Sequence, residues 1–440
     1  MVNFMSKKNK VVYIALSVDT LHHGHINLIN KASKLGKITA GLLTDKAIKN
    51  NKKLPYLTFD QRKKILSNIK GISKIIPQND WSYHHNIKKI KPDYFVHGDD
   101  WLTNGEIENK IKALKELKLY GGKLVEIPHT RGISTGKILN DQFKIATTPE
   151  VRIGSLSRLI ESEKLVRIIE THSPLTGLMI ENFTIKHKNQ IKFFDGMWSS
   201  SLCDSLHMGK PDNEILDLTQ RLDNINNIFE LTTKPLIMDL DTGGKKEHLS
   251  NNIKRLERLG ISAAIIEDKV GLKKNSLFGD KANQQQETIK KFCEKIKIIK
   301  KYQTTDNFLL FSRIESLILK QGMQDALKRA FSYVDAGTDG IMIHSAEKSP
   351  NEIIEFAKKF RKKYKKIPLV SVPSSYSKVH EKTLKKVGFN IVIYANQLTR
   401  SIYKPIQETL KNILKYERSY ESEKRMLKIK EIINLIPSDF

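Results

Sequence analysis

The chain has 440 residues, which is too many for one ordinary hydrophobic core, so two or three domains are expected. Hydrophobic residues make up 39% of it, and no run of 18 or more apolar residues occurs, which argues against a membrane-spanning helix. The net charge of +28 is spread along the chain rather than concentrated in one arm, which argues against a nucleic-acid-binding protein.

The amino-terminal stretch contains a short alternating apolar run that leads directly into Asp19, a pattern typical of a strand rather than a signal peptide. Only two cysteines occur, Cys203 and Cys293, so neither a disulfide framework nor a zinc site is expected. These features predict a cytoplasmic protein with no membrane partner. Strand-like runs alternate with helical patterns through most of the sequence, which predicts the α/β class.

A strand-to-helix turn follows the first strand, in the stretch "DTLHHGHINLI" at residues 19–29. His22 and His25 flank Gly24, which permits close backbone approach, and a helix N-terminus favours phosphate. Two histidines can stabilise the charge that develops on an α-phosphate during nucleotidyl transfer. The stretches "VHGDDW" (96–101) and "HTRGISTGKI" (129–138) provide further context for this motif.

Together these motifs resemble the cytidylyltransferase family of H-x-G-H nucleotidyltransferases over about residues 10–140, which implies a Rossmann-like fold and CTP as co-substrate. The resemblance implies that His22 and His25 are catalytic. It also implies a set of nucleotide-binding residues: Gly24, Lys53 or its neighbour Lys52, Arg62, Asp99 with Asp100, Trp101, Arg131, Ser134 and Thr135. The sequence departs from the family pattern in two motifs: His129 replaces an arginine and Gly136 a threonine in the signature loop, and "LSVD" (16–19) stands in place of "GTFD".

The domain boundary is expected within residues 140–155, where one strand–helix pattern stops and "TTPE" offers a helix start. This predicts a nucleotide-binding domain at 1–145, a linker at 146–164 and a second domain at 165–440. The second domain ends in an amphipathic helical tail, for which we hypothesise packing between subunits.

Eight apolar runs with helix-length separations follow the boundary, and this number predicts a (β/α)8 barrel. The runs are "GLMIEN", "IKFFDGMW", "PLIMDLD", "AAIIEDK", "FLLFSRIE", "GIMIHS", "PLVSVPS" and "NIVIYAN". Almost every run ends in polar residues: Glu181, Ser200, Asp239 and Asp241, Glu267, Arg313 and Glu315, His344 and Ser345, Ser374, and Asn396. Because a barrel carries its site at the carboxyl ends of its strands, these side chains are expected to converge.

The polar strand ends contain a cluster of carboxylates, namely Asp239, Asp241 and Glu267, with Asp212 on a nearby loop. Oxygen ligands of this kind favour Mg²⁺, held through few direct bonds and several waters. Arg313 supplies a planar donor fork for phosphoryl or carboxylate oxygens. The segment "EDKVGLKKNSL" then continues from a buried strand into a lysine- and amide-rich loop, as suits an anionic substrate that must be covered.

Residues 165–400 resemble phosphoenolpyruvate mutase, within the isocitrate lyase/phosphoenolpyruvate mutase superfamily, through "WSSSLCDSLHMGKPD", "MDLDTGG", "EDKVGLKKNSL", "SRIES", "IHS" and "YANQL" in the family's order. The resemblance implies interconversion of phosphoenolpyruvate and 3-phosphonopyruvate with Mg²⁺. It implies three sets of residues: catalytic Asp212, Lys273, Asn275, Arg313 and His344; substrate-binding Trp198, Ser200, Ser201, Leu202, Ser276 and Ser345; and metal-binding Asp239, Asp241 and Glu267. A homo-oligomer, by resemblance a tetramer, is also implied.

The domain order resembles fusions found in phosphonate biosynthesis, so we predict a bifunctional isomerase and cytidylyltransferase that transfers CMP from CTP to a small phosphonate. Three alternatives remain open. The first domain is a regulatory or degenerate nucleotide-binding module, the barrel is a phosphonopyruvate hydrolase or a related decarboxylase, or the protein binds nucleic acid. Asn275 argues against the hydrolase, because hydrolases of the family differ at this loop position.

Overall fold

The computed structural model describes residues 10–49, 51–52, 54–99, 101, 107–128, 147–162, 165–187, 190–271, 273–276 and 284–436. The chain divides into two compact units, one of Met1–Thr147, Arg158–Lys164 and Thr184–Lys192, and one of Thr148–Ser157, Leu165–Phe183 and Phe193–Phe440. None of the described helices is both long and apolar enough to cross a membrane. Cys203 and Cys293 are free thiols.

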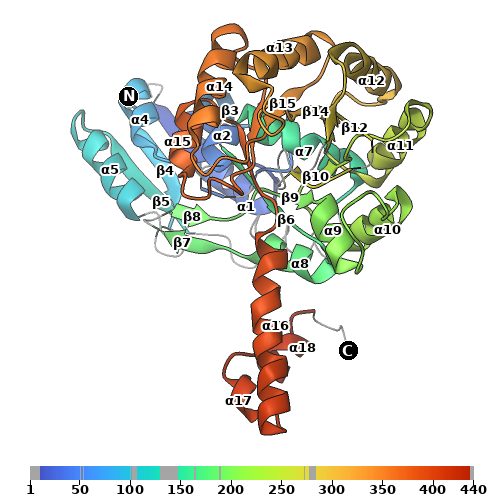
Figure 1. Ribbon diagram of the computed structural model, residues 1–440. Helices are drawn as coiled ribbons and strands as arrows, with labels where there is room; N and C mark the ends of the chain where they lie inside the picture. The colour runs from blue at the N-terminus through green and yellow to red at the C-terminus, as the bar shows by residue number, and fades with distance from the viewer. Residues whose placement is uncertain are drawn as a thin grey trace, which may run out of the picture. The chain divides into compact units, whose positions relative to one another are not determined.

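The first unit is built on a five-stranded parallel sheet with the strand order β3-β2-β1-β4-β5 (Figure 1). Its strands are β1 (Val11–Leu16), β2 (Lys37–Leu43), β3 (Ile72–Gln78), β4 (Tyr94–Gly98) and β5 (Lys123–Ile127). Its helices are α1 (His23–Ser33), α2 (Asp45–Lys49), α3 (Phe59–Ser67), α4 (His84–Ile90) and α5 (Ile107–Lys118). The predicted Rossmann-like arrangement is confirmed.

The central strand β1 explains why this unit has two apolar layers. Val12 and Ile14 pack in one cluster, whereas Tyr13 packs with Phe95 in another, so alternate side chains serve opposite faces. The strand order reverses between β1 and β4, and ligands of open α/β sheets bind at such a reversal, beyond the carboxyl ends of the strands. The loops that follow β1 and β4 therefore define the candidate nucleotide site.

The second unit contains a closed barrel of eight parallel strands in the order β10-β11-β14-β15-β16-β17-β6-β9, which confirms the predicted (β/α)8 fold (Figure 1). Its strands are β6 (Val166–Glu170), β9 (Gly196–Ser199), β10 (Leu236–Asp239), β11 (Ala263–Glu267), β14 (Leu309–Ile314), β15 (Gly340–Ile343), β16 (Leu369–Ser371) and β17 (Ile391–Tyr394). Between and after them come α8 (Pro174–Asn182), α9 (Ser201–His207), α10 (Leu218–Phe229), α11 (Lys246–Leu259), α12 (Ile289–Tyr302), α13 (Gly322–Asp335), α14 (Asn351–Lys363), α15 (Glu381–Lys386) and α16 (Gln397–Tyr416).

The remaining elements are short or lie outside the barrel order. Two two-stranded antiparallel ladders pair β7 (Ile185–His187) with β8 (Gln190–Lys192) and β12 (Lys269–Val270) with β13 (Gln285–Gln286). Helix α7 (Pro149–Glu161) lies within the stretch that was expected to link the domains. Two short helices, α17 (Tyr420–Glu423) and α18 (Ile429–Ile433), follow α16.

The first predicted barrel strand is wrong. The run "GLMIEN" forms the last six residues of α8. The barrel strand is instead β6, which begins eleven residues before this run. Ser173 accepts a hydrogen bond from the Thr176 backbone, and Pro174 occupies the first helical turn, so the local sequence starts a helix here. Glu181 consequently bonds Thr233 beside α8 instead of lining the barrel mouth.

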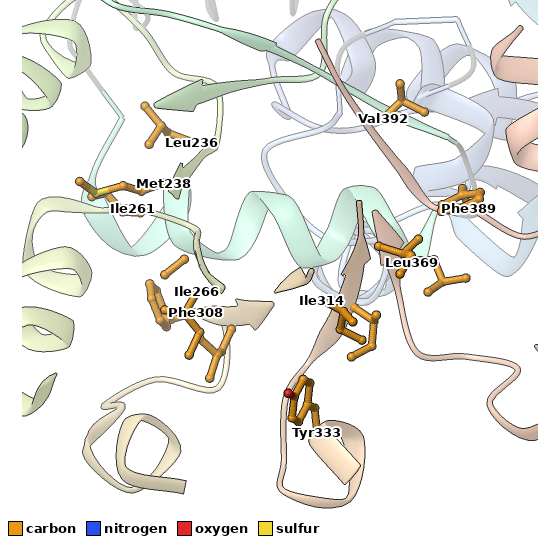
Figure 2. Close-up of a cluster of buried hydrophobic side chains, with 14 of the residues drawn as sticks. Leu236, Met238, Ile261, Ile266, Phe308, Ile314, Tyr333, Leu369, Phe389 and Val392 are labelled. Atoms are coloured by element: carbon orange, nitrogen blue, oxygen red, sulfur yellow. The ribbon is translucent and has the colours of Figure 1, made fainter. Parts of the chain in front are cut away.

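The barrel core lies between the strands and the surrounding helices, where outward-facing strand residues meet apolar helix faces. Figure 2 shows Met238, Ile266 and Ile314 from three strands of the barrel, with Tyr333 of α13 near Ile314. Helix α16 differs from the other helices of the barrel, because none of its residues is buried. Its exposed apolar residues are Ile402, Tyr403, Ile406, Leu410, Ile413, Leu414 and Tyr416.

Candidate active sites

A pocket lies at the carboxyl ends of the barrel strands, where the sequence placed the site. Eleven of the predicted residues line it: Trp198, Ser200, Ser201, Leu202, Asp212, Asp239, Lys273, Asn275, Ser276, Arg313 and His344. Met342, Val372, Ser374, Ala395 and Asn396 complete its wall. The pocket therefore combines a cationic side, an acidic side and a small apolar wall, as an anionic substrate with a carbon backbone requires.

Asp239 is the acidic centre of the pocket, where two hydrogen bonds and the nearby cationic side chains hold its carboxylate. Its Oδ2 accepts a hydrogen bond from Ser201 Oγ at 3.0 Å, and its Oδ1 accepts one from the Asp241 backbone N–H at 3.1 Å. Burial alone would raise the pKa of Asp239, but the ammonium of Lys273 and two guanidinium groups outweigh it and hold the pKa below its usual value. Asp239 is thus maintained as a fixed carboxylate that faces the pocket.

Arg221 of α10 supplies the buried positive charge beneath this centre. Its Nε lies 3.0 Å from Asp204 Oδ2, and its Nη1 donates to the Asp239 carbonyl at 2.6 Å. Its Nη2 donates to Ser199 Oγ at 3.1 Å. A buried guanidinium with all its arms engaged fixes the strand ends of β9 and β10 relative to each other.

The segment of residues 273–276 closes over the acidic side. Lys273 Nζ lies 2.8 Å from Asp212 Oδ1 and also contacts the Asp241 carboxylate and Ser201 Oγ. Asn275 Nδ2 donates to Asp212 Oδ2 at 2.8 Å. The Asp212 carboxylate therefore accepts one hydrogen bond from each of the two predicted loop residues, one on each oxygen. These contacts hold the segment over the pocket.

The cationic side of the pocket is formed by Arg313 and His344. Arg313 Nε donates to Glu315 Oε1 at 2.6 Å, and Arg313 Nη2 lies 3.1 Å from both Glu267 Oε2 and His344 Nδ1. Burial and the neighbouring Arg313 lower the pKa of His344, which favours the neutral imidazole. Arg313 is charged and rigidly held, so this side suits phosphoryl or carboxylate oxygens.

The predicted metal ligands fit a hydrated ion better than a directly chelated one. No group of three His, Cys, Asp or Glu side chains among the described residues is spaced to hold an ion directly. Asp239 nevertheless faces the pocket, and the Asp241 and Glu267 carboxylates near it pair with the cationic side chains of Lys273, Lys269 and Arg313. Mg²⁺ keeps several waters and needs few protein bonds, so this donor set suits it.

In the first unit, His22 and His25 lie together at the start of α1, directly beyond β1. Their ring centroids are 4.0 Å apart, and His25 Nδ1 accepts a hydrogen bond from the His22 backbone N–H at 3.4 Å. This bond leaves Nε2 of His25 to carry the ring proton. Gly24 lies between them, within the first turn of α1. Val18, in the preceding loop, has a φ of 50°, which is rare for a β-branched residue and is typical of functional loops.

Arg62 and Trp101 are both buried and contact other residues of the first unit. Arg62 is fully buried, and its guanidinium donates to the carbonyls of Ser17 and Leu57 and to Asp45. Trp101 is buried and stacks on His97 with centroids 3.8 Å apart. The structure thus places Arg62 as a support for the loop beyond β1, and Trp101 as part of the core under β4.

The other predicted nucleotide-binding residues lie near the ends of the sheet strands or outside the described residues. Asp99 directly follows β4, and its backbone N–H donates to the Ile127 carbonyl at 3.2 Å. Lys52 Nζ lies 4.9 Å from the centre of the Trp81 ring. The predicted positions Lys53, Asp100, Arg131, Ser134 and Thr135, and the departures His129 and Gly136, lie outside the described residues.

A family model described as phosphoenolpyruvate phosphomutase matches residues 156–414, the region that forms the barrel and its pocket. The chain belongs to the phosphoenolpyruvate phosphomutase family. A second family model, described as cytidylyltransferase-like, matches residues 17–140. The predicted combination of a phosphoenolpyruvate mutase domain with an amino-terminal cytidylyltransferase-like domain is therefore confirmed.

Individual relatives of this phosphomutase-family chain agree with both matches. The phosphoenolpyruvate phosphomutase of Tetrahymena pyriformis is 34% identical over 285 residues, which cover 64% of this chain and 91% of that protein. A solved phosphonopyruvate hydrolase in complex with oxalate and Mg²⁺ is 29% identical with a TM-score of 0.57 and covers 66% of this chain and 95% of that chain. The glycerol-3-phosphate cytidylyltransferase of Bacillus subtilis (strain 168) is 35% identical over 127 residues, or 27% of this chain and 87% of that protein.

Not every predicted residue of the phosphomutase-family barrel reaches the pocket. Ser345 lies outside the lining, because its hydroxyl donates to Glu352 Oε2 at 2.7 Å and accepts from the Glu347 backbone. Asp241 and Glu267 stand behind the lining residues. Sequence reasoning missed the support given by Arg221, because a helix arginine fifteen residues before the start of the next strand carries no local signal of burial.

Proposed function

We propose that this chain is a bifunctional enzyme whose barrel, residues 165–440, interconverts phosphoenolpyruvate and 3-phosphonopyruvate. The observation that carries the proposal is the closing segment, in which Lys273 and Asn275 both bond Asp212 above a pocket that also contains Arg313. Moving a phosphoryl group between oxygen and carbon of one molecule requires exclusion of water, which would otherwise capture the group. A segment fixed over the pocket by two polar contacts supplies that exclusion.

In the proposed reaction, the cationic, polar and apolar residues of the pocket bind different parts of the substrate. Arg313 and neutral His344 hold the phosphoryl oxygens, whose charge is spread over three atoms in the transition state. Asn275 positions the migrating group from above, and Lys273 compensates negative charge at the acidic side. Trp198, Ser200 and Leu202 form the wall against which the three-carbon backbone lies. The transfer breaks the phosphorus–oxygen bond of the enol phosphate and forms a phosphorus–carbon bond.

A magnesium ion is part of the proposal, supported by the donor set around Asp239 and by the solved hydrolase relative that contains Mg²⁺. Asp239 would hold the ion, with Asp241 and Glu267 acting through its waters, and the ion would stabilise the enolate oxygen. Arg221 keeps Asp239 and its strand in place through the carbonyl contact.

The experiment that tests the barrel function is ³¹P NMR of the purified protein with Mg²⁺ and 3-phosphonopyruvate. The expected product is phosphoenolpyruvate, and Asn275→Ala should slow its formation by about 100-fold, as for loss of one transition-state donor. Asn251→Ala, at an exposed position on α11, is the matched control. Formation of pyruvate and inorganic phosphate without phosphoenolpyruvate would assign a hydrolase, the activity of the 29% identical relative.

For the first domain, residues 1–145, we propose transfer of CMP from CTP to a small phosphonate with release of pyrophosphate. The paired rings of His22 and His25 at the strand reversal support it, because they stand where a nucleotide's phosphates bind in this fold. The bond from the His22 backbone fixes the ring orientation of His25. Both motif histidines thus act as preorganised donors for the α-phosphate.

Pyrophosphate release from CTP with aminoethyl- or hydroxyethylphosphonate tests this second activity. His25→Ala should lower the rate by about 100-fold or more, the loss expected for a transition-state donor. His23→Ala is the matched control, because His23 is exposed and lies between the two motif histidines. No pyrophosphate from the wild-type protein, together with retained CTP binding, would favour a regulatory nucleotide-binding domain.

A further inference from the structure

Glu315, which directly follows β14, occupies a special place beneath the barrel pocket. Its side chain is fully buried, and neither the predicted metal set nor the predicted substrate set includes it. Burial alone would raise the pKa of this carboxyl, but Arg313 and His344 hold it well below its usual value. A buried carboxylate with this much compensation is stable only while its partners remain in place.

The two oxygens of Glu315 serve two different parts of the site. Oε1 accepts from Arg313 Nε at 2.6 Å and lies 3.1 Å from His344 Nδ1, so it orients both residues of the cationic side. Oε2 accepts from Ser276 Oγ at 2.6 Å and lies 3.5 Å from Lys269 Nζ. Ser276 is the last residue of the closing segment, residues 273–276.

The Ser276 hydroxyl has no hydrogen-bonding capacity left for a substrate. It donates to Glu315 and accepts from Lys269 Nζ and Arg313 Nη2, each at 2.7 Å. One donor and two acceptor positions are all that a hydroxyl has. Ser276 was predicted to bind substrate. Its contacts instead fix the segment to the buried charged side chains of Lys269, Arg313 and Glu315.

When the segment moves away from the pocket, Glu315 loses the donor on Oε2, and Arg313 loses an acceptor. Both groups are buried and charged, so the loss of one hydrogen bond is costly even though Glu315 keeps its contacts with Arg313, His344 and Lys269. Closure therefore completes the hydrogen bonding of the same carboxylate that orients Arg313 and His344. The two halves of the site are joined by one side chain.

We infer that Glu315 is a positioning residue that couples docking of residues 273–276, through Ser276, to the orientation of Arg313 and His344. The inference rests on the proposed barrel function for its kinetic consequences, whereas the coupling itself is a property of the fold. Glu315 does not touch the reacting atoms. It ensures that the phosphoryl-binding pair is ordered only when the pocket is covered.

Hydrogen exchange tests the coupling without any turnover. Glu315→Gln keeps the size of the side chain and removes its charge, and Ser276→Ala removes only the docking hydroxyl. Both should speed amide exchange of residues 273–276 by about tenfold, the effect of weakening one charged hydrogen bond. Ser312→Ala is the control, because this buried serine on β14 bonds Thr338 instead, and its exchange should match the wild type. Unchanged exchange in both Glu315→Gln and Ser276→Ala would overturn the inference.

Kinetics with 3-phosphonopyruvate provide the second test. Both single variants should lower kcat by about 10- to 100-fold through misplacement of Arg313, with KM changed by less than about threefold. The double variant should be no slower than Glu315→Gln alone, and Ser276→Thr, which restores a hydroxyl, should recover most of the rate. Losses that multiply in the double variant would overturn the coupling. A wild-type protein that forms no phosphoenolpyruvate would refute the proposed function only, and the exchange result would then decide the coupling by itself.

Discussion

Lys273 Nζ lies 2.8 Å from Asp212 Oδ1 and pairs with the Asp241 carboxylate, so a lysine of the closing segment neutralises the acidic side of the barrel pocket. Burial alone would lower the pKa of Lys273, but these aspartates raise it, and the ammonium stays charged. A divalent cation that binds near Asp239 has to share the carboxylates with this lysine. The closing segment and the ion are therefore electrostatic competitors.

The first prediction concerns that competition. Lys273→Met removes the charge but keeps the length of the side chain, so Mn²⁺ should bind about tenfold more tightly, a gain of about 1.4 kcal/mol. Electron paramagnetic resonance of free Mn²⁺ measures this affinity. Lys274→Met, at an exposed neighbouring position, should leave it unchanged. Weaker Mn²⁺ binding by Lys273→Met would show that the lysine supports the ion instead of competing with it.

The second prediction concerns Asp268 and pH. Burial raises its pKa to about 6, despite Arg329 and a 2.7 Å bond from the Tyr333 hydroxyl. Between about pH 4 and 6 the folded protein therefore holds a proton that the unfolded chain releases, so this group's contribution to stability falls as pH rises through that window. Above it, the native state carries the full cost of a buried, ionised carboxylate.

Asp268→Asn removes this titration. The free energy of unfolding of the variant, relative to the wild type, should increase by on the order of 3 kcal/mol between pH 4 and pH 7. Urea unfolding followed at several pH values measures the difference. Asp306→Asn, at an exposed position, should give a difference that does not vary with pH. The same flat profile for Asp268→Asn would contradict the assignment.

The third prediction separates a supporting role from a binding role for Arg62. Its guanidinium donates to Ser17, Leu57 and Asp45 inside the first unit. Arg62→Met should lower the free energy of unfolding of that unit by about 1–3 kcal/mol, because it leaves the carbonyls of Ser17 and Leu57 without this donor, whereas Asp45 keeps Arg158 at 3.4 Å. Chemical denaturation measures the loss, with exposed Lys63→Met as the control. A stable variant with a raised KM for CTP would instead support direct nucleotide contact.

The fourth prediction concerns helix α16 and assembly. Its apolar residues recur at helical spacing yet are exposed, with 57% of the Leu410 side chain and 80% of the Leu414 side chain accessible. A stripe of this kind marks a surface that another chain covers, and we expect a homo-oligomer. Leu410→Glu combined with Leu414→Glu should lower the mass measured by light scattering, whereas Lys411→Glu should not. An unchanged mass after deletion of residues 411–440 would contradict a role for the tail in assembly.

Sequence patterns predicted seven of the eight barrel strands, because short apolar runs that end in polar residues are typical of the parallel strands of a barrel. The run "GLMIEN" failed because its three large apolar residues are too few to show a period, and only the Ser173–Pro174 start distinguishes its helix from a strand. The pocket residues were predictable from motifs. The supports were not, since Arg221, Lys269 and Glu315 gain their partners only when the closed barrel brings distant segments together.

The position of the first turn of α16 has a consequence for how the enzyme is assayed. Asn396 lines the pocket, and α16 begins at the next residue, with the Thr399 backbone N–H bonded to buried Glu170 at 2.5 Å. Whatever covers the apolar stripe of α16 is therefore joined through one continuous helix to the wall of the pocket. We expect turnover per chain to decline on dilution, so that specific activity measured at nanomolar protein would understate the activity of the concentrated enzyme.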